Sequence, residues 1–427
     1  MILHIDANSF YASCERLFRP DLDNKPIAVL SNNDGMTIAL NQECKKLGFS
    51  RGDVFAKEKY RYQRNNVFVF SSNYTLYADI SKRINMIYEY YCPEVEFYSI
   101  DESFLNFPDW KNLNFVDLAF EIKNCIWQSV HIPVSVGIAP TKTLAKFCNS
   151  LAKKRNGVCS WFSINQEEEL KNFKAYDIWG IGRAKAALLE RKGIFSAYDL
   201  KNYPLHLVKK YLTITGFNTV RELNEIPSLK FETSITRKNI TTSRSFSKKI
   251  ETLVELETAL SEFTQLAVSR MRENNLACKF ISVCILTGKS YNENEKSYYN
   301  VAHASFEKHT SFLPEILGTA IKLLHSIFLQ GYKYKKVMIT LLDLTEDKHI
   351  QGELFEETSI EILNKKKSIM NVYDSVNEKY GKGTLHTGIR NQIADFNSQG
   401  NHADWIMNRN FLSPEYTTNF NELPIVL

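Results

Sequence analysis

Helical apolar spacing and short apolar runs alternate along the first 165 residues. Apolar side chains three or four positions apart predict helices at 6–18, 37–48, 74–92, 118–130 and 141–154. Compact apolar runs predict strands at 2–5, 26–30 and 133–139, and a pair of strands within 94–107. This order predicts an α/β layer structure with helices on one face of a mainly antiparallel sheet.

The pattern changes after about residue 166. Residues 176–200 predict a helix, a Gly-x-Gly turn, a second helix and a short third helix. The remainder predicts amphipathic helices near 253–274 and 313–330, strands at 279–287 and 336–344, an acidic linker at 346–361 and a polar tail at 365–427. The chain of 427 residues shows no internal repeat, so we expect an α+β protein of several domains.

Basic residues are concentrated in one of these segments. The whole chain has a formal net charge of +5, and residues 233–343 alone contain 15 Lys and Arg against 10 Asp and Glu, the same excess. Residues 233–250 contain five basic residues and no acidic one. A local excess of this kind indicates a surface for a polyanion such as nucleic acid.

The composition excludes several other classes of protein. It is 44% hydrophobic and 24% charged, which is typical of a globular protein. No apolar run reaches the roughly eighteen residues that a membrane span needs, so no membrane partner is expected. The N-terminus lacks the pattern of a signal peptide, and the 8 cysteines form no C-x-x-C pair. We therefore expect a cytoplasmic protein with reduced thiols.

The segment "YSIDESFLNF", residues 98–107, places two carboxylates inside an apolar strand pattern. Asp101 and Glu102 need partners there, because carboxylates are rarely buried alone. Asp6 ends the first predicted strand, and if that strand pairs with this hairpin, three carboxylates meet at one sheet edge. Such oxygen ligands suit Mg²⁺. By themselves, the residues also allow Asp6 to cap the next helix, with Asp101 and Glu102 as exposed turn residues.

Three motifs in fixed order carry a family resemblance. "DANSFYASCE" at 6–15, "YSIDESFLNF" and "VSVGIAPTKTLAKFCNSLAKKRNG" at 134–157 together resemble the catalytic core of the Y-family translesion DNA polymerases. "LSPEYTTNFNELP" at 412–424 is similar to the C-terminal extension of the UmuC branch of that family. The resemblance covers essentially the whole chain, and it implies an error-prone, template-directed polymerase that copies damaged DNA.

The resemblance implies a right-hand architecture and a two-metal site. The implied domains are a palm at 1–10 and 72–165, fingers at 11–71, a thumb with a helix-hairpin-helix at 166–232, an α+β DNA-binding little finger at 233–345, and an extension at 346–427 that includes the acidic linker. Asp6, Asp101 and Glu102, with the carbonyl of Ala7, would bind two Mg²⁺ ions. The 3′-hydroxyl of a primer would attack the α-phosphate of a dNTP and release pyrophosphate.

Four residues match nucleotide-binding positions of the family. Tyr11 matches the steric gate, where its ring would leave no room for a ribose 2′-hydroxyl, and Phe10 beside it is a further nucleotide-binding candidate. Lys153 matches a lysine that reaches the incoming triphosphate. Lys45 stands where many relatives carry an arginine, so its contact with the triphosphate lacks the bidentate geometry of a guanidinium. Without the resemblance, a buried aromatic pair and solvated lysines are the favoured interpretations of these residues.

DNA contacts are implied for the thumb and the little finger. Gly180 and Gly182 resemble a helix-hairpin-helix turn whose backbone N–H groups approach a phosphate. The little finger would use Lys238, Arg244, Lys248 and Lys249 on the DNA backbone. An ordinary helix turn and a solvated charged face are the plain alternatives.

The segment "QGELF" at 351–355 resembles a peptide that binds the β sliding clamp, with Gln351, Leu354 and Phe355 as anchors. A short segment that packs on its own protein would look similar. The UmuC resemblance further implies a UmuD′ dimer and the RecA filament as partners, acting at the nucleoid on primer-template DNA. Three alternatives remain: a polymerase IV type enzyme that works without these partners, a non-catalytic DNA-binding scaffold, and a palm-fold nucleotide cyclase.

Overall fold

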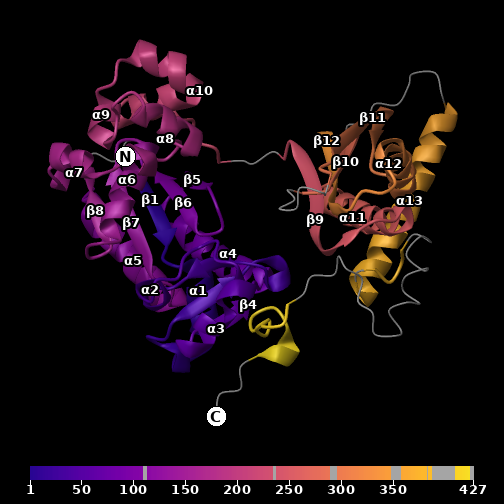
Figure 1. Cartoon of the computed structure of the whole chain (residues 1–427), viewed down its shortest axis with the longest axis horizontal. Coiled ribbons are helices and arrows are strands. Elements are labelled where there is room, and N and C mark those ends of the chain that lie inside the picture. Colours follow the sequence, from indigo (N-terminus) through magenta and orange to yellow (C-terminus); the bar gives the residue numbers. More distant parts are fainter. Residues whose placement is uncertain are drawn as a thin grey trace. The chain divides into compact units, whose positions relative to one another are not determined.

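The computed structural model describes residues 1–108, 113–233, 237–288, 296–347, 357–381, 383–386 and 409–423. It divides into two compact units (Figure 1). The first unit is Met1–Ile235 together with Asn408–Leu427, and the second is Thr236–Met407. The second unit is therefore inserted in the sequence of the first, which contains both ends of the chain.

A five-stranded sheet forms the centre of the first unit, with strand order β5-β6-β1-β7-β8. Its strands are β1 (Ile2–Ala7), β5 (Val95–Phe97), β6 (Glu102–Asn106), β7 (Val134–Ala139) and β8 (Val158–Ser160). Strand β1 is antiparallel to β6 and to β7, and β7 and β8 are parallel. The mainly antiparallel sheet predicted from the sequence is confirmed.

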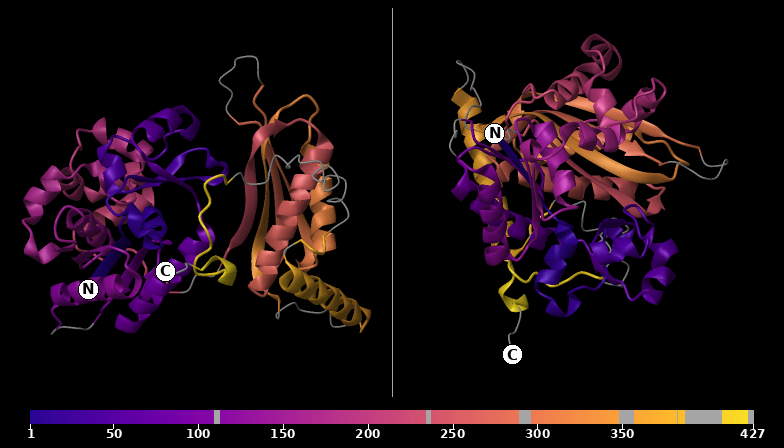
Figure 2. Two further views of the ribbon diagram at one scale, coloured as in Figure 1. Left: turned by 90° about the horizontal axis from the view of Figure 1, so that it is seen from below. Right: turned by 90° about the vertical axis from the view of Figure 1, so that its left-hand side faces the viewer.

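Helices cover both faces of this sheet, so the prediction of helices on one face is wrong (Figures 1 and 2). Helices α1 (Phe10–Leu17), α4 (Tyr74–Tyr91) and α5 (Phe115–Val130) share one core with Val136 and Ile138 of β7. Helix α6 (Lys142–Ala152) packs on the opposite face. Apolar spacing gives each helix an apolar side, but it does not say which face of a sheet that side covers.

A glycine lets α6 approach the sheet closely. A Cβ atom on Gly137 would lie 2.1 Å from the carbonyl oxygen of Ala145 and 2.3 Å from the amide nitrogen of Asn149. The buried Asn149 side chain then donates hydrogen bonds to the carbonyl oxygens of His4 and Ser135, at 3.0 and 2.7 Å. These contacts fix α6 against β1 and β7.

A small three-stranded sheet, order β3-β2-β4, follows α1 in the sequence. Residues 37–48 were expected to form one helix, but Thr37–Leu40 form β3 and pair with β2. The Asn41 side chain then caps a short helix by accepting a hydrogen bond from the amide of Cys44. The elements here are β2 (Ile27–Leu30), β3 (Thr37–Leu40), β4 (Phe68–Ser71), α2 (Gln42–Lys46), α3 (Phe55–Arg64) and the 3₁₀ helices η1 (Pro20–Leu22) and η2 (Asn32–Asp34).

A helical region follows β8 in the same unit. Its elements are η3 (Trp161–Ser163), α7 (Gln166–Asn172), η4 (Ala175–Asp177), α8 (Arg183–Glu190), α9 (Ala197–Lys201) and α10 (Leu205–Leu223). The helix predicted before the Gly-x-Gly turn is only the three-residue η4. Glu222 of α10 is buried and accepts a hydrogen bond of 2.9 Å from the amide of Thr143, which joins this region to the start of α6.

The second unit contains a four-stranded antiparallel sheet with strand order β11-β10-β12-β9. Helices α11 and α12 share one hydrophobic core with this sheet. Its elements are β9 (Asn239–Ile250), α11 (Leu253–Glu273), β10 (Leu276–Leu286), β11 (Tyr299–Thr310), α12 (Leu313–Ile327), β12 (Tyr334–Glu346) and α13 (Glu357–Tyr380). The linker predicted at 346–361 ends earlier, because α13 begins at Glu357. Met370 of α13 is buried in this core, and Arg272 of α11 forms an ion pair with Asp374 at 2.7 Å.

Residues 409–423 return to the first unit and end in the 3₁₀ helix η7 (Phe420–Glu422). The predicted clamp-binding residues Gln351, Leu354 and Phe355 lie outside the described residues. Within the described part of the chain, no helix has the length and apolar character needed to cross a membrane.

Candidate active site

The pairing of β1 with β6 brings the three candidate acids to one edge of the five-stranded sheet. Asp6 lies directly opposite Glu102 in the register of the two strands. The amide of the next residue, Ala7, donates a hydrogen bond of 2.8 Å to the carbonyl oxygen of Asp101. The predicted pairing of the first strand with the hairpin is therefore confirmed.

The hairpin between β5 and β6 explains why two acids stand side by side. Residues 98–101 form the turn, and the amides of Tyr98 and Ser99 both donate to the carbonyl oxygen of Glu102, at 3.1 and 3.0 Å. The Ser99 hydroxyl donates to Asp101 Oδ1 at 2.6 Å and accepts from the amide of Glu102 at 3.1 Å. Because Asp101 belongs to the turn and Glu102 begins the strand, the alternation of side chains does not send them to opposite faces.

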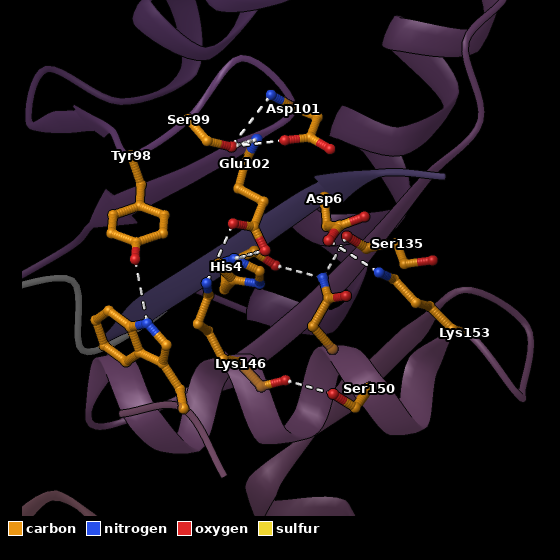
Figure 3. Close-up of polar contacts among 12 residues, drawn as sticks. His4, Asp6, Tyr98, Ser99, Asp101, Glu102, Ser135, Lys146, Ser150 and Lys153 are labelled. Carbon is orange, nitrogen blue, oxygen red and sulfur yellow. Dashed lines mark hydrogen bonds and ion pairs between the residues drawn. The ribbon is translucent and has the colours of Figure 1, made fainter. Parts of the chain in front are cut away.

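Two of the acids contact a lysine of the α6 region (Figure 3). Asp6 Oδ2 lies 2.8 Å from Lys153 Nζ, and Glu102 Oε2 lies 3.2 Å from Lys146 Nζ. Asp101 turns instead toward Ser99. Among the described residues, no group of three or more His, Cys, Asp or Glu side chains is already gathered around a point where a metal could bind. The acids therefore share one edge, but their side chains are held apart.

The electrostatics of the edge favour added positive charge. Burial raises the pKa of Asp6 to about 6; the negative charges of Glu102 and Asp101 add to this rise, and Lys153 opposes it. Three carboxylates that disfavour one another's ionisation are relieved by a cation. Their oxygens form the hard donor set that Mg²⁺ prefers, so the residues present fit a divalent metal ion.

His4 lies beneath these acids and was not singled out by the sequence. It is 2% exposed, and neither ring nitrogen has a hydrogen-bond partner in the described structure. Its Nε2 atom lies 3.7 Å from Glu102 Oε1. Burial lowers the pKa of His4 well below its usual value, with Lys146 and Lys153 acting in the same direction. His4 is therefore a neutral neighbour of Glu102 rather than a second counter-ion.

Lys146 is a second residue that sequence reasoning missed. Its ammonium group lies over the rings of Tyr98 and Trp179, 4.3 and 4.9 Å from their centroids, while it contacts Glu102. The Trp179 indole also donates to the Tyr98 hydroxyl at 3.2 Å. Lys146, Glu102 and Trp179 border a cavity of about 220 Å³ that also reaches Asp6. The available signal was the spacing of Lys146 and Lys153, two helical turns apart and so on one face of α6.

The two aromatic candidates on α1 have different surroundings. Phe10 is 3% exposed and lies in the core, so the structure does not support a direct contact between its ring and a ligand. Tyr11 is half-buried. Its ring stacks on Tyr77 at 4.4 Å between centroids and meets Tyr74 edge-on at 6.0 Å. Tyr11 thus belongs to a wall of three tyrosines built from α1 and α4.

The candidate lysines lie in one basic region, with an arginine that sequence reasoning missed. Burial lowers the pKa of Lys45, and the charges of Arg51 and Lys153 lower it further. Arg51 also acts on the pKa of Tyr11, which burial raises. Lys45 is therefore close enough to Arg51, Lys153 and Asp6 for their charges to act on it. Arg51 precedes Gly52, whose φ of +94° marks a turn that its "RGD" sequence could have indicated.

The Gly-x-Gly turn has the strained backbone that glycine allows. Gly180 has a φ of +90°, and a Cβ atom there would lie 2.8 Å from Thr219 Oγ1. Gly182 is the residue that precedes α8, and a Cβ atom there would meet nothing within 4 Å. Lys185 donates to the carbonyl oxygen of Gly180 at 3.2 Å. The turn is thus held in shape, with a lysine at its side.

The basic candidates of the second unit do not form one uniform surface. Lys238 and Lys248 are exposed, and Lys249 is partly buried. Arg244 lies 3.7 Å from Glu262 and over the ring of Phe263, both on α11. Arg244 is therefore engaged on the helix-covered side of β9, and a phosphate would have to compete with Glu262 for it.

Family models match most of the chain. Residues 5–150 match the model of the impB/mucB/samB family, and residues 237–354 match the C-terminal domain of the same family. Residues 367–426 match a domain of unknown function, DUF4113.

Curated relatives align with nearly the full chain. Protein UmuC of Salmonella typhimurium is 37% identical over 425 residues, which is 98% of this chain and 98% of that protein. Protein MucB of Escherichia coli is 33% identical over 432 residues, which is 100% of this chain and 99% of that protein. DNA polymerase IV of Acetivibrio thermocellus is 26% identical over 404 residues, which is 91% of this chain and 97% of that protein.

Solved structures share the fold at low sequence identity. A Y-family DNA polymerase chimera of Dbh and Dpo4 matches with a TM-score of 0.67 and 21% identity, covering 80% of this chain and 98% of the chimera. An insertion ternary complex of Dbh DNA polymerase matches with a TM-score of 0.54 and 20% identity, covering 80% of this chain and 98% of that one.

Proposed function

The chain belongs to the impB/mucB/samB family as a UmuC-type Y-family DNA polymerase, and we propose that Asp6, Asp101 and Glu102 carry its chemistry. It is a DNA-directed DNA polymerase that performs error-prone translesion synthesis, with primer-template DNA and dNTPs as substrates and a dependence on divalent metal ions. A role in the SOS response is general to the family. This membership decides against the scaffold and cyclase alternatives.

The three acids would hold two Mg²⁺ ions, together with the carbonyl oxygen of Ala7. When bound, these ions lower the pKa of the primer 3′-hydroxyl and neutralise the triphosphate during phosphoryl transfer. Before substrate binds, Asp6 and Glu102 would stay paired with Lys153 and Lys146. Lys153, 2.8 Å from Asp6, would then be released to contact a triphosphate oxygen.

The basic region and the tyrosine wall would bind the incoming nucleotide. Lys45, Arg51 and Lys153 would surround the triphosphate, since an anion relieves the repulsion that Arg51 and Lys153 exert on Lys45. Tyr11 would lie under the deoxyribose and exclude a 2′-hydroxyl, supported by Tyr74 and Tyr77. Phe10 would contribute through the core rather than by contact.

DNA would be held by backbone contacts that ignore sequence, as a polymerase for damaged templates requires. Gly180 and Gly182 would contact a phosphate near the primer terminus, and Lys238, Lys248 and Lys249 would bind the duplex backbone, with Arg244 available once it leaves Glu262. The domain boundaries would follow the right-hand plan. The palm would comprise 1–10 and 72–165, and the fingers 11–71, with α1 packed in a core that both share.

We also propose the partners that the UmuC relationship suggests: a UmuD′ dimer, the RecA filament and the β sliding clamp, with the clamp bound by Gln351, Leu354 and Phe355. The higher identity to UmuC and the match of residues 367–426 to a C-terminal domain favour this assembly over a polymerase IV that works alone. Pull-down of the clamp by the wild type, and its loss in a variant with Leu354→Ala and Phe355→Ala, would support the clamp site. Equal capture by both would contradict it.

The observation that carries the proposed chemistry is the register that sets Asp6 opposite Glu102, with Asp101 hydrogen-bonded to Ala7. The test is primer extension with Mg²⁺ and dNTPs on undamaged and abasic templates, with and without UmuD′, RecA and the clamp. Asp101→Ala should lower kcat at least about a thousandfold, because its carboxylate would help to hold the metal ions that neutralise the negative charge of the transition state.

Asp79→Ala is the matched control. Asp79 forms a helix-surface ion pair with Arg83 at 2.9 Å, so its removal should leave extension unchanged. Extension that survives in Asp101→Ala would overturn the metal assignment. Extension by the wild type without any partner would overturn the dependence on UmuD′ and RecA and leave the metal assignment intact.

A further inference from the structure

The C-terminal segment 409–423 docks on the first unit beside α1 and β4 (Figure 1, yellow). The amide of Phe411 donates a hydrogen bond to Ser71 Oγ at 3.0 Å, and the amide of Ser71 donates one to the carbonyl oxygen of Phe411 at 2.9 Å. The Phe411 ring meets Phe55 edge-on at 5.5 Å, and Tyr416 stacks on Phe18 at 4.6 Å. The segment therefore contacts both the small sheet and α1.

The segment also contacts Asn73, which is buried and 2% exposed. The Asn73 amide nitrogen donates to Ser413 O and Ser413 Oγ at 3.1 Å each, and to the carbonyl oxygen of Pro414 at 3.2 Å. The Asn73 carbonyl oxygen accepts from the amide of Leu76 at 3.2 Å and so caps α4. One side chain thus joins the C-terminal segment to the start of α4.

The same helix carries the tyrosines behind Tyr11. Tyr77 is 0% exposed, stacks on Tyr11, and donates its hydroxyl to Glu15 Oε1 at 2.5 Å. Glu15 is on α1, one helical turn after Tyr11, and the Ser413 hydroxyl lies beside its carboxyl group. Ser413 therefore borders both helices that hold the Tyr11 ring, α4 through Asn73 and α1 through Glu15.

We propose that the C-terminal segment 409–423 is a positioning element for nucleotide sugar selection, acting on Tyr11 through Asn73, Glu15 and Tyr77. This inference rests on the proposed role of Tyr11 as the residue that excludes a ribose 2′-hydroxyl. It assigns a task to the C-terminal part of the region that matches a domain of unknown function. Other parts of that region belong to the second unit, so only 409–423 is concerned.

The physical reason lies in how a steric gate works. The Tyr11 ring excludes the 2′-oxygen of a ribose only if the ring cannot move aside by even part of an atomic diameter. The residues that support the ring must therefore be rigidly held. Buried polar groups with several hydrogen bonds supply stiffness, because every displacement leaves a donor or acceptor unpaired. The two N–H groups of the Asn73 amide are shared among three acceptors of the segment, so the start of α4 is fixed to it.

The test compares insertion of a dNTP and of the matching rNTP by full-length variants, under conditions in which the wild type extends primers. Asn73→Asp keeps an oxygen that caps α4 but loses every donor to Ser413 and Pro414. The ratio of kcat/KM for dNTP to that for rNTP should fall roughly tenfold, the rate equivalent of one or two hydrogen bonds of about 1 kcal/mol. A chain that ends at residue 408 should show at least the same fall.

Phe420→Ala is the matched control, because Phe420 belongs to the same segment and is 92% exposed. Its sugar ratio should equal that of the wild type. Tyr11→Ala is the reference for complete loss of the gate and should lower the ratio most. Hydrogen exchange of the amides at 74–77 should quicken in Asn73→Asp and not in Phe420→Ala, which reports the loosened start of α4 without any turnover. Asn73→Ser, which loses both amide N–H donors and keeps an oxygen that can cap α4, replaces Asn73→Asp if that variant does not fold.

The outcomes separate the two proposals. A merely structural role of the segment would lower the rates for both sugars together and leave their ratio unchanged. If Asn73→Asp and the shortened chain keep the wild-type ratio while Tyr11→Ala loses it, the positioning role is overturned and the gate stands. If Tyr11→Ala also keeps the ratio, the assignment of the gate itself is overturned.

Discussion

The carboxylates at the sheet edge of Asp6, Asp101 and Glu102 (the acid edge) and the single carboxylate of Glu15 are held in opposite ways. At the acid edge, Asp6 and Glu102 contact Lys153 and Lys146, and the Lys153 side chain is 41% exposed. Behind the tyrosine wall, Glu15 is 1% exposed and contacts the equally buried Tyr77. The first group has partners that water, metal or phosphate can replace, whereas the second is sealed in the core.

The difference follows from the tasks proposed for the two groups. Ligands for metal and triphosphate must exchange partners in each catalytic cycle, and the pair of Asp6 with Lys153 exchanges most easily because the lysine is exposed. A wall that measures the shape of a sugar must not move, and buried hydrogen-bonded groups resist movement. The contacts of the acid edge can thus be replaced during catalysis, whereas the contacts of the tyrosine wall are kept.

The largest expected effect comes from moving the helix that carries both lysines. In Gly137→Ala, the new Cβ atom would lie 2.1 Å from the carbonyl oxygen of Ala145, so α6 must shift away from β7. We expect the free energy of unfolding to fall by about 3 kcal/mol or more. Primer extension should be lost along with it, because Lys146 and Lys153 leave the acid edge. Thermal unfolding and primer extension measure the two effects.

Gly318→Ala provides the control for a glycine of α12 in the second unit. A Cβ atom there meets nothing within 4 Å, and alanine favours a helix by about 1 kcal/mol over glycine. This variant should be as stable as the wild type or more stable. A Gly137→Ala protein with wild-type stability and activity would show that the close approach of α6 is not needed.

A smaller effect separates the two lysines of the acid edge. Lys153→Met should raise the KM for dNTP roughly tenfold with little change in kcat, because a charged hydrogen bond to the triphosphate is worth about 1.5 to 3 kcal/mol. Lys146→Met should instead lower kcat about tenfold or more at unchanged KM, as is typical when a residue that orients a metal ligand is lost. Steady-state insertion of a single nucleotide gives both parameters.

Lys154→Met is the control for this pair, because Lys154 is exposed next to Lys153 and has no contact with the acids in the described structure. Its kinetic constants should match those of the wild type. If Lys146→Met raises KM in the same way as Lys153→Met, both lysines bind substrate, and the role of Lys146 in holding Glu102 is wrong.

The acid edge could be predicted from the sequence because short sequence motifs carry its three acids. Asp101 and Glu102 stand in a short hairpin motif, and Asp6 ends a strand that needs one neighbour to complete the site. Sequence patterns did not reveal Lys146, whose partner Glu102 lies 44 positions away, or the contact of Asn73 with Ser413 across 340 positions. Such contacts depend on how elements pack, and a polar residue in the sequence does not say which distant group it meets.

The failed element predictions have the same cause. Thr37–Leu40 carry apolar residues that suit either a helix or a buried strand, and pairing with β2 decides for the strand. The placement of α6 on the second face of the sheet depends on Gly137, a residue that apolar periodicity does not weigh. The local pattern predicted which segments are ordered, and tertiary contacts decided how several of them are used.

The smallest expected effect on turnover comes from Glu15→Gln, which tests how firmly the tyrosine wall is sealed. Burial raises the pKa of Glu15 to about 7, above its ordinary value of 4.5. Glutamine keeps an oxygen that can accept from Tyr77 but has no proton to lose in this range. Insertion kinetics should therefore stay close to those of the wild type, and the difference should appear in stability.

The sign of that difference follows from proton binding. From about pH 4.5 to about pH 7, the unfolded wild type has lost the Glu15 proton while the folded form still holds it, so raising the pH favours unfolding. Relative to Glu15→Gln, the wild type should lose up to about 3 kcal/mol across this window and lose no more above it. Urea unfolding of both proteins at several pH values gives the difference, in which the other titrating groups cancel. Parallel curves would mean that water or a nearby cation reaches Glu15, and then the tyrosine wall would be as open to exchange as the acid edge.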